Sequence, residues 1–149
     1  MPLNRKNKVR KILLASDHAG LKLKKTIKKF LVKKKMKILD LGTNRENSVD
    51  YPDYAHILAT KIKNKKNYFG ILICGSGIGM SMAANRHKNI RAALSYDIKS
   101  AKLSRLHNNA NVIAIGARLT KKNIALKCIS VFLKTKFEGG RHIRRIRKI

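Results

Sequence analysis

The chain has 149 residues, of which 44% are hydrophobic, and this is typical of one globular domain that buries a core without disulfides or a structural metal. No apolar stretch approaches the roughly 20 residues of a membrane-spanning helix, and the basic N-terminus lacks the apolar segment of a secretory signal, so we expect a cytoplasmic protein without a membrane partner. The net charge of +29 favours nucleic acid as a partner, but no aromatic-interleaved basic stripe accompanies the scattered lysines, so we expect nonspecific binding at most.

Apolar runs alternate with helical patterns along the chain. The apolar runs predict strands at residues 11–16, 36–42, 68–74, 90–95 and 111–116. The helical patterns predict helices at about residues 21–31, 53–64, 78–86, 97–107 and 121–133, the second of them capped by Asp53. Because right-handed crossovers cover both faces, this alternation predicts an α/β fold with a parallel sheet between helices. We expect one domain, residues 1–149, with a basic N-terminal extension at 1–10 and a basic C-terminal tail at 137–149.

The third predicted strand runs into a glycine-rich loop, "ICGSGIGMS", at residues 73–81. A phosphate loop of the NTPase kind is excluded, because Met80 rather than lysine follows Gly79. A dinucleotide fingerprint is weakened but stays open, because the glycines occupy the first, third and fifth positions rather than the first, third and sixth. The remaining interpretation is an anion nest, in which backbone N–H groups of residues 75–79 hold a developing oxyanion.

The two cysteines have different settings, and their spacing indicates free thiols rather than a disulfide or a zinc site. Cys128 lies within an amphipathic helical pattern and is expected in the core. Cys74 ends the third strand beside the anion nest, whose field favours thiolate over thiol. A thiolate beside an oxyanion hole suits proton abstraction next to a carbonyl group, whereas a buried strand residue is the structural alternative. Both interpretations of Cys74 stay open at this point.

Other polar residues lie where ligands bind in parallel sheets. Asp17 and His18 follow the first strand, and Arg118 follows the fifth. His107 and Asn108 end a predicted helix, and we expect them nearby. Because the functional crevice of an open parallel sheet lies beyond the carboxyl ends of its strands, these residues are expected to meet the glycine loop there.

Acidic residues are rare, and several of them stand near glycine, proline or histidine at element ends, namely Asp17, Asp50, Asp53 and Glu138. We expect these positions to require an acid. In the tail, Arg141 and Arg145 lie four residues apart, so one helical face can form a clamp for a phosphate dianion. The remaining histidines give weaker signals: His56 and His87 are expected to be structural, and His142 has no partner that the sequence identifies.

Several motifs together resemble one known family. In chain order they are "ASDHAG", "DLGT", "DYPDYA", "GILICGSGIGMSMAANR", "IRAAL", "LSRLHNNANVIAIGAR" and "FEGGRHIRRI". From about Lys11 to Arg147 the chain resembles the type B ribose-5-phosphate isomerases, a family that also contains galactose-6-phosphate and allose-6-phosphate isomerases. The resemblance implies a Rossmann-like three-layer αβα sandwich with a five-stranded parallel sheet. It also implies a homodimer or homotetramer with active sites at the subunit interface, and interconversion of ribose 5-phosphate and ribulose 5-phosphate through a cis-enediolate, without metal or cofactor.

The resemblance also implies a role for each matching residue. Cys74 is the base that moves the proton, Ser76 relays protons between the substrate oxygens, and His107 opens the furanose ring as an acid. The residues that the resemblance implies bind the substrate are Asp17, His18, Tyr51, Gly75, Gly77, Ile78, Gly79, Asn108, Arg118, Arg141 and Arg145. Within this set the loop amides hold the enediolate oxygen, Asp17 binds sugar hydroxyls and Tyr51 lines the pocket. The phosphate is held by His18, Arg141 and Arg145, while Asn108 and Arg118 are expected to reach in from the partner chain.

Two departures from the family pattern and two alternatives remain. Ser76 stands where many relatives have threonine, and Ile78 and Met80 offer no carboxylate in place of the cysteine base. The alternatives are a hexose-6-phosphate isomerase of the same family and a nucleic-acid-binding protein on an isomerase fold. The high positive charge is the reason for the second alternative, although compositional drift toward lysine and solvated helix faces are the preferred explanation of that charge.

Overall fold

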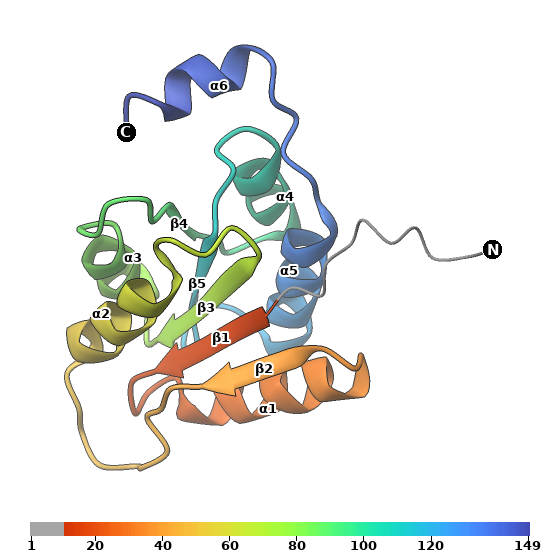
Figure 1. Cartoon of the computed structure of the whole chain (residues 1–149). Coiled ribbons are helices and arrows are strands. Elements are labelled where there is room, and N and C mark those ends of the chain that lie inside the picture. Colours follow the sequence, from red (N-terminus) through yellow and green to blue (C-terminus); the bar gives the residue numbers. More distant parts are fainter. Residues whose placement is uncertain (1–10) are drawn as a thin grey trace.

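The structure is a computed structural model that describes residues 11–149, so the predicted extension at 1–10 lies outside the described residues. Within the described part the chain forms one parallel sheet of five strands in the order β2-β1-β3-β5-β4 (Figure 1). The strands are β1 (Lys11–Ser16), β2 (Lys37–Asp40), β3 (Tyr68–Cys74), β4 (Ala92–Leu94) and β5 (Val112–Gly116). The helices are α1 (Leu21–Lys33), α2 (Tyr51–Ile62), α3 (Ile78–Ala84), α4 (Ile98–Leu106), α5 (Lys122–Lys134) and α6 (Arg141–Ile146). Among residues 11–149 we find no helix with the length and hydrophobicity needed to span a membrane.

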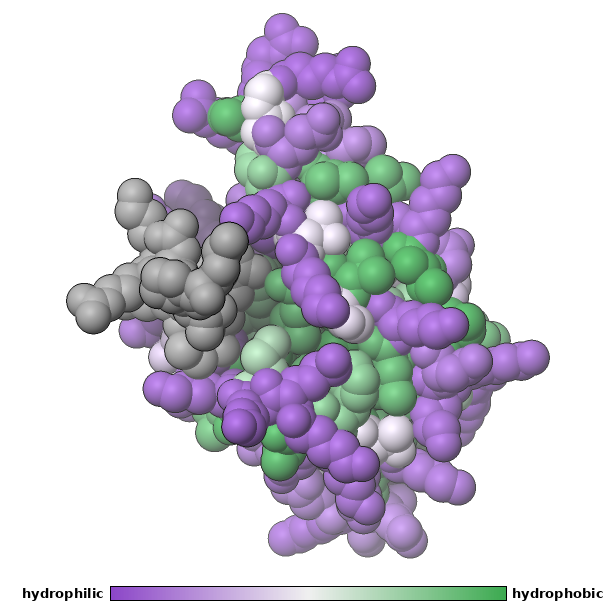
Figure 2. Space-filling view, turned by 90° about the vertical axis from the view of Figure 1, so that its right-hand side faces the viewer, coloured by the Kyte–Doolittle hydropathy of each residue, from purple (hydrophilic) through white to green (hydrophobic). Residues whose placement is uncertain are grey.

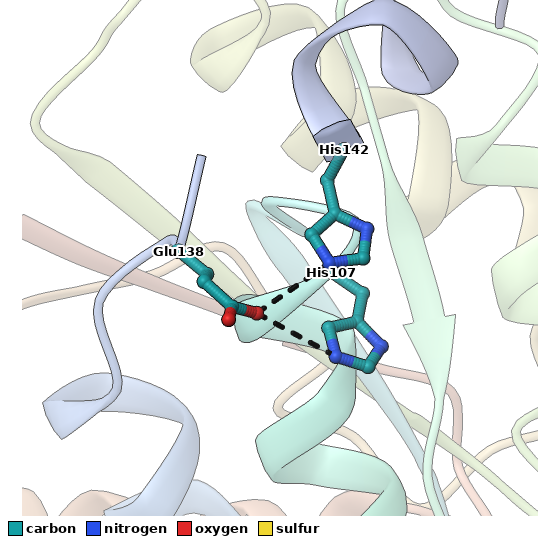
Figure 3. Close-up of side chains that lie close together, drawn as sticks. All are labelled: His107, Glu138 and His142. Atoms are coloured by element: carbon teal, nitrogen blue, oxygen red, sulfur yellow. Dashed lines mark ion pairs between the residues drawn. The ribbon is translucent and has the colours of Figure 1, made fainter. Parts of the chain in front are cut away.

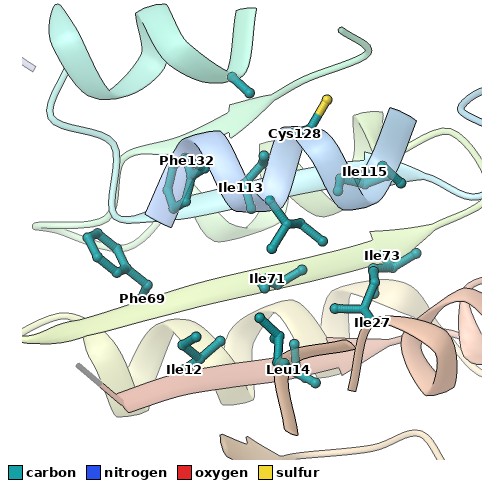
Figure 4. Packing of buried hydrophobic residues seen from close by; sticks show 14 of the residues in the cluster. Ile12, Leu14, Ile27, Phe69, Ile71, Ile73, Ile113, Ile115, Cys128 and Phe132 are labelled. Atoms are coloured by element: carbon teal, nitrogen blue, oxygen red, sulfur yellow. The ribbon is translucent and has the colours of Figure 1, made fainter. Parts of the chain in front are cut away.

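Two buried clusters, one on each face of the sheet, hold the layers together. On one face Ile71 and Ile73 of β3 pack with apolar residues of α1, α4 and α5, and Phe69 meets Phe132 edge to face (Figure 4). On the other face Leu72 and Cys74 pack with α2 and α3. A central strand buried on both faces must be apolar at every position, which explains the continuous run at residues 68–74. The predicted three-layer αβα sandwich is therefore confirmed.

The second helix begins earlier than predicted. Asp50 occupies its N-cap position, and Pro52 lies in the first turn. The N–H groups of a first turn have no acceptor within the helix, so proline, which lacks an N–H group, fits there at no cost. Asp53 sits in that first turn, and its N–H donates to the carbonyl oxygen of Asp50. The prediction that Asp53 caps this helix is therefore wrong, and the side chain of Asp50 makes no capping hydrogen bond either.

One lysine of α1 is buried, whereas most lysines of the helix are exposed to solvent. Lys24 is fully buried, and its Nζ donates to Asp40 Oδ1 at 2.6 Å, the carbonyl oxygen of Thr43 at 2.6 Å and Asn44 Oδ1 at 3.1 Å. Burial lowers the pKa of Lys24, an effect that the contact with Asp40 partly offsets. Because Thr43 N–H also donates to the carbonyl oxygen of Ser16, Lys24 secures the loop after β2 against the end of β1.

One face of the molecule carries hydrophilic and hydrophobic side chains together. Figure 2 shows hydrophilic side chains distributed around the face that it views, with hydrophobic residues between them, rather than gathered in one stripe. α6 lies apart from the layers of the sandwich, beyond α4 (Figure 1).

Candidate active site

A pocket of about 560 Å³ opens at the carboxyl edge of the sheet. It is lined by Asp17, Tyr51, Cys74, Gly75, Ser76, Ile78, Gly79, Met82, Arg118 and Leu119. Eight of these ten residues are predicted site residues, whereas a pocket of about 570 Å³ at the amino ends of the strands, around Arg91 and Arg105, contains none. The structure thus confirms the expected crevice at the carboxyl edge.

Cys74 is buried and still borders this pocket. Its side chain packs into the cluster between the sheet and the α2–α3 layer, with 4% of the residue exposed. Its Sγ accepts a hydrogen bond from the N–H of Gly77 at 3.1 Å. The structural interpretation of Cys74 is therefore confirmed, and its position at the pocket keeps the functional interpretation open.

The other cysteine has a contrasting environment. Cys128 of α5 is fully buried in the opposite cluster, and burial raises its pKa to about 11. It therefore stays a thiol near neutral pH, as predicted for a core residue.

The glycine loop turns back on itself to reach the sulfur. Gly77 has a φ of 79°, and a Cβ there would lie 2.7 Å from Leu94 Cδ1 and 2.9 Å from the backbone of Ile115. Glycine is therefore required at this position. The next amide, that of Ile78, donates to Ser76 Oγ at 3.2 Å. Two of the five amides at residues 75–79, those of Gly77 and Ile78, thus donate within the loop.

Two neighbouring side chains close the sides of the loop. The ring of Tyr51 lies over Gly79, since a Cβ on Gly79 would lie 2.7 Å from Tyr51 Oη. Arg118 lies over Gly75 in the same way, and its own N–H donates to the carbonyl oxygen of Gly75 at 3.0 Å. Arg118 thus lines the pocket of its own chain, whereas we expected it to reach the site from the partner.

The residues after β1 are held in place by backbone contacts. Asp17 is buried, and its Oδ1 accepts a hydrogen bond from the N–H of Gly20 at 3.0 Å, which leaves its second carboxylate oxygen for the pocket. His18 is half-buried, and its Nδ1 accepts a hydrogen bond from the N–H of Val49 at 3.1 Å. A neutral His18 therefore carries its proton on Nε2, which is the donor needed toward an anion.

The remaining predicted residues lie elsewhere in the chain. His107, Asn108, Arg141 and Arg145 do not line this pocket. α4 runs antiparallel to the strands, so its C-terminal end lies at the amino edge of the sheet, where Arg91 Nε donates to the carbonyl oxygen of Asn108 at 3.0 Å. The prediction that His107 and Asn108 meet the glycine loop is therefore wrong within one chain.

His107 has two neighbours that the sequence did not pair with it. Its ring stacks on that of His142, with centroids 4.4 Å apart, and its Nε2 lies 3.7 Å from Glu138 Oε2 (Figure 3). The rarity of acids pointed to Glu138, whereas nothing in the sequence indicated the stacking of the two rings. Met82 and Leu119 of the pocket were also missed, and both are largely exposed apolar residues.

The fold and this pocket together define an α/β protein in which a thiol, a hydroxyl and a carboxylate line one pocket at the carboxyl edge of a parallel sheet. The family model described as Ribose/Galactose Isomerase matches residues 12–149. The ribose-5-phosphate isomerase B of Escherichia coli is 39% identical over 141 residues, which cover 95% of each protein. The chain therefore belongs to the ribose/galactose isomerase family.

Solved structures agree with this membership. The crystal structure of a ribose 5-phosphate isomerase from Thermotoga maritima is 48% identical, with a TM-score of 0.91 over 95% of this chain and 97% of that one. The structure of ribose-5-phosphate isomerase B from Mycoplasma genitalium, with bound ribulose-5-phosphate, is 47% identical, with a TM-score of 0.90 over 93% of this chain and 92% of that one.

Proposed function

We propose that this protein is an aldose-ketose isomerase that interconverts ribose 5-phosphate and ribulose 5-phosphate, in the cytoplasm and as a step of the pentose phosphate pathway. The observation that carries the proposal is the sulfur of Cys74, which borders the pocket at the carboxyl edge and accepts an N–H from the glycine loop. The relative that was solved with ribulose-5-phosphate has the same fold over nearly its whole length, which supports this choice of substrate.

The proposed reaction moves one proton between neighbouring carbons. The thiolate of Cys74 removes the proton from C2 of the open-chain aldose, and the electron pair of that bond forms the C1–C2 double bond of an enediolate with its charge on O1. Ser76 passes the O2 proton to O1, and the Cys74 thiol then returns its proton to C1 as the C2 carbonyl forms. Atoms and charge balance without an external acceptor, so a thiol, a hydroxyl and fixed donors suffice.

The hydrogen bond from Gly77 to the sulfur has a further consequence for this cycle. The N–H stabilises the thiolate before the reaction, and its hold on the sulfur weakens once the sulfur has taken up a proton. At that moment negative charge has moved to the substrate oxygen, for which the same N–H becomes available. The loop thereby stabilises charge on the enzyme first and on the intermediate afterwards.

The rim of the pocket supports a site shared between two copies of the chain. Tyr51, Ile78, Met82 and Leu119 expose large apolar surfaces around an open pocket, which is unusual for a surface that stays in water. The ring-opening histidine and the phosphate-binding arginines are needed there, yet they lie elsewhere in their own chain. We therefore infer a homodimer, or a pair of dimers, in which a second copy covers the rim and supplies these groups to the site.

A turnover assay with ribose 5-phosphate in the presence of a chelator tests the proposed function, with ketose formation as the readout. We expect isomerisation that does not depend on added metal. Because the family model also names galactose isomerases, kcat/KM should be compared for ribose 5-phosphate, allose 6-phosphate and galactose 6-phosphate. A larger kcat/KM for either hexose phosphate would assign the chain to the hexose branch, and no conversion of any of the three would refute isomerase activity.

A further inference from the structure

Two histidines and one carboxylate converge on a single point at the end of α4. Nε2 of His107 lies 3.7 Å from Glu138 Oε2, and Nε2 of His142 lies 3.4 Å from the same oxygen (Figure 3). The two rings are nearly parallel, with 16° between their planes. One ligating atom from each of the three residues fits within 4.8 Å of the others. Three good metal donors thus surround one small volume.

The spacing of these atoms suits a metal ion better than direct hydrogen bonds. An N–H group that donates to oxygen usually lies about 2.7–3.2 Å from it, and both distances to Glu138 exceed that range. With metal–ligand bonds of about 2.1 Å, two ligands of a tetrahedral ion lie about 3.4 Å apart. The observed separations of 3.4 and 3.7 Å are close to this value, so an ion can bind once the stacked rings turn to direct both Nε2 lone pairs at it.

The backbone holds the three residues together before any ion arrives. The N–H of Glu138 donates to the carbonyl oxygen of Leu106, the neighbour of His107, at 3.1 Å. Gly139 and Gly140, both with positive φ, turn the chain so that His142 returns to the side of Glu138. The side chain of His142 is 8% exposed, whereas those of His107 and Glu138 are 40% and 59% exposed. The cluster is therefore anchored on one side and open to ions on the other.

The donor set also selects the kind of ion. Two imidazoles and one carboxylate bind Zn²⁺ and its first-row neighbours, whereas Ca²⁺ and Mg²⁺ require sets of oxygen ligands. Arg141, Arg144 and Arg145 on α6 add positive charge around the cluster and oppose the binding of any cation. Only ions with a strong preference for nitrogen overcome that repulsion.

We propose that His107, Glu138 and His142 form a binding site for a divalent transition-metal ion such as Zn²⁺, and that the bound ion inhibits the enzyme. The inhibitory part rests on the proposed function, in which His107 opens the sugar ring as an acid. An ion bound to Nε2 occupies the imidazole that must interact with the substrate, so the ion and the ring-opening step compete for the same ring. The ion is a regulator here and has no part in the isomerisation itself.

Calorimetric titration of the chelator-treated full-length protein with Zn²⁺ tests the site without any need for activity. We expect one ion per chain, and Co²⁺ as a spectroscopic substitute should show nitrogen and oxygen ligation without a thiolate-to-metal charge-transfer band. Glu138→Gln and His142→Asn should each weaken Zn²⁺ binding by more than about tenfold, because loss of an outer-shell partner alone weakens metal affinity by about that factor. Circular dichroism of both variants checks that they fold.

Two control variants distinguish this site from other candidates. Cys74→Ser should bind Zn²⁺ as the unaltered protein does, since the thiol is not a ligand. His87→Asn should also leave binding unchanged, although His56 Nδ1 lies 2.7 Å from His87 Nε2 in another exposed histidine pair. Loss of binding in either control, or unaltered binding in both Glu138→Gln and His142→Asn, would overturn the proposed site.

Activity measurements address the inhibitory part separately. Turnover of ribose 5-phosphate should fall as the site fills, along the same curve as Zn²⁺ binding, and chelator should restore it. If Zn²⁺ binds at this site and turnover does not change, the proposed inhibition is refuted, whereas the proposed metal site stands. If the metal-free protein does not isomerise sugar phosphates at all, the proposed function fails, but the calorimetric result on the metal site stands on its own.

Discussion

The N–H of Gly77 donates to the sulfur of Cys74 at 3.1 Å, so the loop that follows β3 is closed onto the last residue of that strand. The amide and the thiol form one unit, because the left-handed conformation of Gly77 is what directs the amide backward. A change to either partner should therefore alter the chemistry of the pocket, and the two changes should differ in their effect on stability.

Cys74→Ser should abolish isomerisation. A serine hydroxyl is a far weaker base than a thiolate, and general-base catalysis contributes at least about 100-fold, so we expect kcat to fall by that factor or more. The variant should keep its fold and its affinity for sugar phosphates, as measured by circular dichroism and by inhibitor binding. Near-normal turnover would remove Cys74 as the base.

Gly77→Ala should lower stability as well as activity. The added Cβ meets Leu94 and the backbone of Ile115, and a left-handed alanine costs about 1–3 kcal/mol before any clash is counted. Gly139→Ala is the control, since Gly139 has a φ of 73°, close to that of Gly77, and an alanine methyl group there meets only Ile143 Cδ1, at an ordinary contact distance of 3.7 Å. Thermal unfolding of both variants is the measurement, and equal losses would show that the contacts of Gly77 do not matter.

Arg141→Ala should chiefly raise KM. An arginine that binds the phosphate acts on the ground state and the transition state alike, and a charged hydrogen bond contributes about 1.5–3 kcal/mol, or roughly 10- to 100-fold in KM. Arg144→Ala is the control, because Arg144 lies on the same helix outside the predicted clamp. An unchanged KM in Arg141→Ala, or an equal rise in both variants, would argue against the clamp.

A shared site predicts that two inactive variants complement each other. Cys74→Ser lacks the base, and His107→Asn lacks the ring-opening acid, so a mixed dimer contains one pocket with both groups intact. Mixing the two proteins under conditions of subunit exchange should restore part of the activity. A mixture of Cys74→Ser with Ser76→Ala should gain nothing, because both changes fall in the same pocket. Failure of the first mixture to regain activity would refute a site that combines Cys74 of one chain with His107 of the other.

The buried pair of Lys24 and Asp40 predicts how stability depends on pH. Burial would raise the pKa of Asp40, but hydrogen bonds from Lys24 and Gly42 outweigh it and lower the pKa below its ordinary value of 3.8. A carboxyl group whose folded-state pKa is lowered adds stability that is complete above its ordinary pKa and is lost as the pH falls through the folded-state pKa. The free energy of unfolding of the unaltered protein should therefore drop below about pH 4.

Asp40→Asn tests this pair. The variant should be less stable by about 3–5 kcal/mol at neutral pH, because Lys24 is left buried without its counter-charge, and its stability should fall less steeply in acid. Lys28→Met is the control, since Lys28 is an exposed partner of Asp40 at 3.3 Å and a surface pair contributes less than about 1 kcal/mol. Urea unfolding across the pH range gives both values, and an equal loss in the two variants would contradict the role of burial.

The amino-acid sequence by itself determined the strands and the pocket at their carboxyl ends. A parallel strand covered on both faces must be apolar throughout, so the run at residues 68–74 identified the central strand, and the glycines after it identified the loop. Both signals are local, since strand, loop and following helix are adjacent in the chain. The motifs at fixed spacing then indicated the family.

Only the tertiary structure decided which of the polar residues meet. His107 follows a helix that returns to the far edge of the sheet, so it contacts Glu138 and His142 instead of the glycine loop. Lys24 lies on the buried stripe of α1 between Leu21 and Ile27, and the carboxylate that pairs with its charge there comes from Asp40 on β2. Contacts of this kind join residues that are distant in the chain, and their geometry depends on how the helices pack on the sheet, which no local pattern records.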